Sequence, residues 1–335
     1  MPSPEDLYHK ALAEARKLYE RDERRLRGAI VDLLRDVADR ISGTITRLAG
    51  EGGELTLQDM GIIEREVGVA LGQFRTSYEG QLLSQISQAA TVAATGSQRA
   101  LNVYVQGVAF PGLPGFDDIP RRVVDIMTER TIKGLNLSDR IWRLDYASRQ
   151  WLQQDVLNGV NQGWSAAKIA KRAERWLLPD RVLPKGDVPS AIYSNQPRNV
   201  SYNAYRLART EINQAYGEAR DQADAELADA GIALGSRWVL SPQHAQRMLA
   251  ATDGRTARDI CDDWAERMPG TVILDGQPPA GKRAEQRMLA RLQRYGIDPR
   301  GVYLPGRTPL DHPNGLCTTE TVLTPREVLM ERMAA

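Results

Sequence analysis

The chain has 335 residues, which is enough for two or three domains with their own cores. Its 44 lysines and arginines nearly balance its 43 aspartates and glutamates, so the total charge does not indicate a nucleic-acid partner. Two cysteines exclude a disulfide framework, the polar first residues predict no signal peptide, and no apolar run approaches the roughly 20 residues of a membrane span. We therefore expect a soluble protein made in a reducing cytoplasm.

Residues 1–110 are predicted to form a hairpin of two long helices. In residues 5–49, apolar side chains recur every three to four positions, at Leu26, Ile30, Leu33, Val37, Ile41 and Leu48. Gly43 and the glycines of 50–53 are expected to break this helix, and Thr56 to cap a second one that buries Ile62. Residues 89–108 are small and weakly polar, which favours an arm that orders against another subunit. We therefore expect the N-terminal half to project from the C-terminal domain.

Residues 119–178 are predicted to form a small helical domain after a loop rich in glycine and proline. Its three helices are expected at Arg121–Lys133, after Ser138 and after the cap residue Ser165. We interpret its four tryptophans as core residues, namely Trp142, Trp151, Trp164 and Trp176. The stretch 121–185 carries thirteen basic and seven acidic residues. We interpret these as solvated helix faces rather than a DNA-binding surface, because no aromatic-rich platform accompanies them.

The last part of the chain mixes helices with short strands. Four prolines make 179–198 a linker, and 199–230 is predicted to be one helix ended by Gly231. Short strands are expected at 236–240, 271–274, 302–304 and 318–323, with a helix at 284–294 and a terminal helix capped by Thr324. The chain is therefore predicted to be mainly α, with an α+β domain over 199–335.

Four of the five histidines and cysteines of the chain lie in this C-terminal domain, at His244, Cys261, His312 and Cys317. Imidazole and thiolate groups are the ligands of structural zinc sites, which close with four protein ligands. The same residues would also fit a buried cysteine pair with two hydrogen-bonded histidines. If only three of them held a metal, Asp253 or Asp259 would be candidates to activate a hydrolytic water. A metal-dependent hydrolase is thus the enzymatic alternative.

The segment Gly276–Lys282 imitates a phosphate-binding loop, because it lies between a predicted strand and a predicted helix. The position after the lysine should be serine or threonine, and it is Arg283. Pro278 and Pro279 also remove two backbone N–H groups that such a loop would donate to phosphate. We predict a surface turn that binds no nucleotide.

Several of these segments together resemble the Mu-F-like phage head-morphogenesis (minor capsid) family. The resemblance is clearest over 138–323. The matching segments are Leu137–Leu144, Ala208-Arg209-Thr210-Glu211, Ser241-Pro242-Gln243-His244, Asp259-Ile260-Cys261-Asp262 and His312-Pro313 with Cys317. The chain departs from the family pattern at Gly315 and Ala257, where family members commonly carry further cysteines.

The resemblance implies a non-enzymatic phage minor capsid protein that acts in head morphogenesis. It implies a place in the virion, inside the head near the portal vertex, in several copies. The expected partners are the portal protein and capsid subunits, with contact to packaged DNA and none to a membrane. The implied cofactor is a structural zinc ion held by His244, Cys261, His312 and Cys317. A DNA-contacting factor that uses the basic stretch 121–185 is the remaining alternative.

Overall fold

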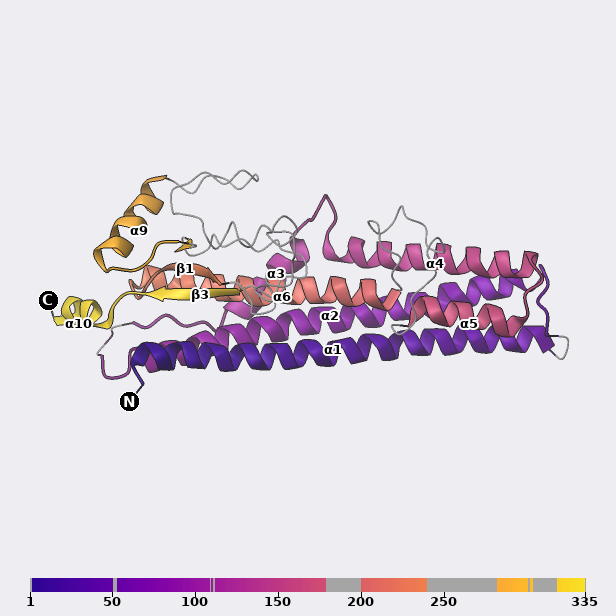
Figure 1. The fold of residues 1–335 in the computed structure, drawn as a ribbon, viewed down its shortest axis with the longest axis horizontal. Helices are drawn as coiled ribbons and strands as arrows, with labels where there is room; N and C mark the ends of the chain where they lie inside the picture. The colour runs from indigo at the N-terminus through magenta and orange to yellow at the C-terminus, as the bar shows by residue number, and fades with distance from the viewer. Residues whose placement is uncertain are drawn as a thin grey trace, which may run out of the picture. The chain divides into compact units, whose positions relative to one another are not determined.

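The computed structural model is mainly helical, as the sequence predicted, and it describes residues 2–50, 53–108, 110, 112–178, 200–239, 282–300, 302–303 and 318–334 (Figure 1). The helices are α1 (Pro4–Ala49), α2 (Met60–Tyr104), α3 (Ile119–Glu129), α4 (Leu137–Asn161), α5 (Ala166–Leu177), α6 (Val200–Asp229), α9 (Lys282–Arg294) and α10 (Arg326–Ala334). The strands are β1 (Ala233–Val239), β2 (Val302–Tyr303) and β3 (Thr318–Leu323). The predicted linker 179–198 and the predicted strand 271–274 lie outside the described residues.

The chain divides into two compact units, and each is assembled from separate stretches of sequence. The first unit comprises Met1–Glu20, Ile86–Asp125 and Thr210–Ala335. The second comprises Arg21–Gln85 and Ile126–Arg209. The helices α1, α2 and α6 therefore each contribute residues to both units.

The small sheet belongs to the first unit and is antiparallel, in the order β2-β1-β3. Its central strand β1 pairs Ser236 with Tyr303 of β2 on one side and with Thr321 of β3 on the other. The sheet packs against α9 through a buried apolar cluster of Leu234, Met288, Leu292, Val302 and Val322. The apolar residues of α9 are four positions apart, which is the spacing that places them on one helical face.

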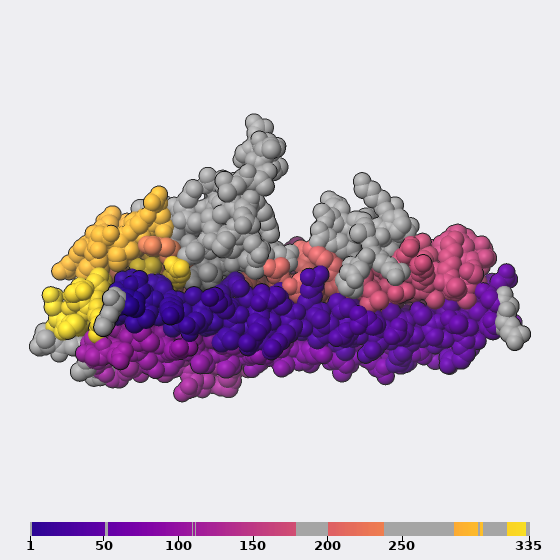
Figure 2. Space-filling view, turned by 60° about the horizontal axis from the view of Figure 1, so that its bottom comes forward, coloured from indigo at the N-terminus to yellow at the C-terminus, as the bar shows by residue number. Residues whose placement is uncertain are grey.

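The beginning of α1 and the end of α2 pack into the first unit together with the C-terminal strands. Ser97 and Tyr104 of α2 are buried, as is Tyr8 of α1. The Tyr8 hydroxyl donates to Thr321 Oγ1 at 2.8 Å, and the Tyr104 hydroxyl donates to the Thr324 carbonyl oxygen at 2.7 Å. In Figure 2 the indigo N-terminal turns lie beside the yellow C-terminal residues. The prediction that 89–108 projects as an arm is therefore wrong: its small residues permit close helix packing within the chain.

Close packing is most evident where Gly96 of α2 meets Ala15 of α1. A Cβ atom added at Gly96 would overlap the Ala15 side chain, so the two helices approach within a distance that only glycine allows. The alanines around Gly96 are also buried, namely Ala89, Ala90, Ala93, Ala94 and Ala100. Small residues that suggested weak order in the sequence thus mark a tight helix pair.

The second unit contains most of the predicted middle domain. Trp151 of α4 stacks on Trp176 of α5 with ring centroids 4.1 Å apart, and both are buried, as predicted. Beside them, Arg172 of α5 forms a bidentate ion pair with Asp155 of α4, with its shortest N–O distance at 2.7 Å. The core interpretation is wrong for Trp142, which is 49% exposed.

Several helix limits differ from the prediction for identifiable reasons. Gly43 does not break α1, because the roughly 1 kcal/mol cost of a helical glycine is small beside the burial of Ile41 and Ile45 on either side. α4 begins at Leu137 rather than after Ser138, and its cap Asn136 forms a capping box with Asp139. Ile62, predicted on the buried face of α2, is exposed.

Other predicted limits are confirmed. Ser165 caps α5, and its side chain accepts from the Lys168 N–H. Gly231 ends α6 in a left-handed conformation with φ of 75°, and the next N–H, from Ile232, bonds back to the Leu227 carbonyl oxygen. Across the described residues, none of the helices combines the length and the apolar character that crossing a membrane requires.

Candidate functional site

The four predicted zinc ligands, His244, Cys261, His312 and Cys317, lie outside the described residues, as does most of the imitation phosphate loop that ends at Lys282. Within the described ranges, no group of three or more histidine, cysteine, aspartate and glutamate side chains is arranged to hold a metal ion. The zinc site therefore stays a prediction.

All four residues of the resembling motif in α6, Ala208 to Glu211, have described positions. The Arg209 Nε atom lies 3.5 Å from a carboxylate oxygen of Glu23 in α1, within the second unit. The Tyr205 hydroxyl donates to the same carboxylate oxygen, and burial, followed by the effects of Glu23, raises the pKa of Tyr205 to about 12. Glu211 is fully buried and belongs to the first unit. The motif thus contributes Glu211 to the interior of the protein, while Arg209 is half-buried.

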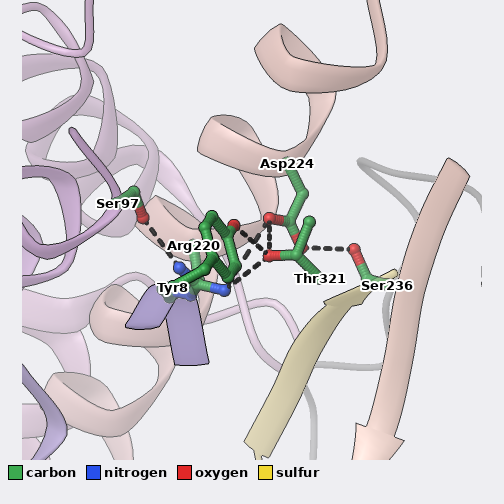
Figure 3. Close-up of polar contacts among 6 residues, drawn as sticks. All are labelled: Tyr8, Ser97, Arg220, Asp224, Ser236 and Thr321. Carbon is green, nitrogen blue, oxygen red and sulfur yellow. Dashed lines mark hydrogen bonds and ion pairs between the residues drawn. The ribbon is translucent and has the colours of Figure 1, made fainter. Parts of the chain in front are cut away.

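The most concentrated polar chemistry in the described residues is a buried network in the first unit (Figure 3). We call it the Arg220–Asp224 network, and its members are Tyr8, Ser97, Arg220, Asp224, Ser236 and Thr321. They come from α1, α2, α6, β1 and β3. The side chains of Arg220 and Asp224 are 3% and 0% exposed, and their closest N–O distance is 3.7 Å. One turn of α6 therefore holds an ion pair that is almost completely removed from water.

The hydroxyl groups of the network complete the coordination of this ion pair. Arg220 donates to Ser97 Oγ at 2.8 Å and to Thr321 Oγ1 at 2.9 Å. The two carboxylate oxygens of Asp224 accept from Thr321 and from Ser236, each at 2.6 Å. Thr321 Oγ1 also accepts from Tyr8, so both of its lone pairs are occupied and its own proton points to Asp224. Both oxygens of Asp224 act as acceptors, which is the pattern of an ionised carboxylate.

Burial favours the neutral forms of Arg220 and Asp224, whereas their ion-pair and hydrogen-bond partners favour the charged forms. Burial raises the pKa of the Asp224 carboxyl, while the Arg220 guanidinium and the Ser236 and Thr321 hydroxyls act in the other direction. Burial lowers the pKa of the Arg220 guanidinium, but Asp224 and two neighbouring tyrosines outweigh it, so the net shift is upward. Burial raises the pKa of the Tyr8 phenol to about 12. Each charged group thus depends on its neighbours to remain charged.

The network is built to hold segments together rather than to act on a substrate. Its polar groups bond to one another, and its six members are all buried. Sequence reasoning missed it, although one signal was present. Arg220 and Asp224 follow Ala219 and Ala223, which are buried members of the apolar face of α6. Two opposite charges four residues apart beside a buried alanine row indicate a buried pair.

Comparison with known proteins found no similar family model, no similar curated protein and no similar solved structure.

Proposed function

We propose that the chain is a phage minor capsid protein that acts in head morphogenesis near the portal vertex, without enzymatic activity. In this role it associates with the portal protein and capsid subunits and lies inside the head, close to packaged DNA. A zinc ion held by His244, Cys261, His312 and Cys317 would be structural and would stabilise the C-terminal domain. It would not be catalytic, because a site closed by four protein ligands leaves no position for a catalytic water.

The observation that carries the proposal is the resemblance of residues 138–323 to the Mu-F-like family, together with the positions of the motif residues that the structure describes. In α4, Leu137, Ile141 and Leu144 are buried, and Asp139 completes the capping box. In α6, Arg209 pairs with Glu23. These motif residues pack within the chain or pair with another helix, which fits a structural role. The Arg220–Asp224 network supports the same reading, since its groups serve cohesion.

Co-expression tests the proposed partner directly. The full chain is produced together with the portal protein encoded by the same phage genome, and the complex is isolated by size-exclusion chromatography. A portal protein from an unrelated phage serves as the control. We expect the chain to elute with its own portal protein and not with the control. Elution of the chain alone in both mixtures would remove the portal protein as a partner.

A further inference from the structure

The outward face of α4 carries a pair of aromatic side chains that lie outside the buried core. Trp142 and Tyr146 are 49% and 50% exposed, although both side chains are large and apolar enough to be core residues. Their rings stack on each other with centroids 5.1 Å apart and an interplanar angle of 15°. The two residues are one helical turn apart, and the opposite side of α4 buries Ser148, Trp151 and Asp155. The pair therefore presents two flat rings away from the core.

The charge around this pair is positive. Between Ile126 and Leu178 the second unit has nine basic and five acidic residues. Two of the five acidic residues, Asp145 and Asp155, are buried and form ion pairs with Arg149 and Arg172, so these pairs are neutral and the excess of positive charge comes from the other residues. Arg143, next to Trp142, is exposed, and Lys133 is exposed in the turn before α4. The aromatic pair thus belongs to a segment with excess positive charge, with exposed Arg143 beside it and exposed Asp139 one turn before it.

We propose that this face of α4 binds single-stranded nucleic acid. A base extends the Trp142–Tyr146 stack, Arg143 contacts a neighbouring phosphate, and the exposed Gln150 one turn further along hydrogen-bonds to a base edge. Single-strand binding proteins combine these two elements, aromatic platforms and backbone-directed cations, and such binding tolerates many sequences because every base has a π face. An acidic protein segment would match the charge, but only a nucleic-acid strand carries a flat base at every unit to continue the stack. The proposal does not depend on the proposed capsid function.

Fluorescence anisotropy of a labelled oligonucleotide with the full chain tests this site. Trp142→Ala and Tyr146→Ala should each weaken binding of a mixed-sequence single strand by about 5- to 150-fold, the range for loss of one stacked base. Trp142→Phe keeps a π face and should restore most of the affinity. All these side chains are exposed, so far-UV circular dichroism should remain that of the unchanged chain.

A matched charge control separates stacking from general attraction. Lys171→Ala removes one exposed positive charge from α5, as Arg143→Ala does from α4. We expect Arg143→Ala to weaken binding by more than fivefold and Lys171→Ala by less than twofold. The same oligonucleotide as a duplex should bind more weakly, because its bases are already stacked.

Three results would overturn the proposal. The first is the absence of measurable binding by the unchanged chain at low salt. The second is an equal loss of affinity in Lys171→Ala and Arg143→Ala, together with no effect of Trp142→Ala, which would indicate non-specific electrostatic attraction. The third is binding of a polyglutamate peptide as tight as that of the single strand and equally dependent on Trp142, Arg143 and Tyr146. That result would assign the face to an acidic protein.

Discussion

The Arg220–Asp224 network makes a sharp prediction about stability. Asp224→Asn keeps the shape of the side chain and removes its charge. The Arg220 guanidinium then remains in the interior, 3% exposed, without the carboxylate that balances it. Loss of one partner of a buried ion pair costs about 3–5 kcal/mol, because the remaining charge is neither hydrated nor paired. We expect the free energy of unfolding to fall by that amount.

The chain contains a matched control for this variant. Arg121 and Asp125 are also an arginine and an aspartate four residues apart on one helix, and their closest N–O distance is again 3.7 Å. Their side chains are 71% and 59% exposed, however. Exposed pairs with this spacing contribute about 0.3–0.5 kcal/mol. Asp125→Asn should therefore change the free energy of unfolding by less than about 0.5 kcal/mol, and the contrast between the two variants measures what burial and the hydroxyl partners of Asp224 add to the pair.

The assay is urea unfolding of the full chain, followed by far-UV circular dichroism. Tryptophan fluorescence recorded in parallel follows mainly the second unit, which contains four of the six tryptophans. A double-mutant cycle uses Arg220→Met, Asp224→Leu and the two together, and the double variant should be far less destabilised than the sum of these two single changes. A loss in Asp224→Asn as small as that in Asp125→Asn, or additive effects in the cycle, would refute the idea that the network is a buried, mutually dependent cluster.

Three further predictions concern other parts of the chain. The pKa of Tyr8 is about 12 in the folded chain and 10.0 in the unfolded chain. The neutral phenol therefore stabilises the folded state fully below pH 10, and about 3 kcal/mol of the free energy of unfolding is lost as pH rises to 12. Tyr8→Phe should remove this loss from the alkaline unfolding curve. Gly96→Ala should destabilise the chain by about 1–3 kcal/mol in thermal unfolding, because its Cβ would overlap Ala15. Gly80→Ala on the same helix has open space for its Cβ and should stabilise the chain by about 0.5–1 kcal/mol. Purified chain should retain zinc by elemental analysis, and Cys317→Ser should lose it; an unchanged zinc content would exclude that ligand.

The sequence predicted helices well where a long apolar repeat dominates. α1, α2 and α6 follow from three-to-four spacing, and Gly231 and Ser165 mark ends whose chemistry is local. These signals depend on neighbours within one or two turns. The error at Gly43 has the same origin, since a local penalty was given more weight than the packing of a long helix.

The partners of each helix could not be predicted in the same way. Tyr8 bonds to Thr321, which is 313 positions away, and neither residue has a local feature that identifies the other. The stretch 89–108 was misjudged because small residues are compatible with both weak order and close packing, and only the position of α1 distinguishes them. Trp142 was assigned to the core by residue type, although its helical phase places it opposite Trp151.

The most direct test of the account is the protein composition of purified phage heads. Heads are separated from tails and from unassembled protein, and the chain and the portal protein are quantified by mass spectrometry with labelled reference peptides. If the proposed function holds, the chain is present in heads in a fixed ratio to the portal protein and in several copies per head. Its complete absence from purified heads, with the chain found only in the soluble fraction of infected cells, would contradict the proposed function.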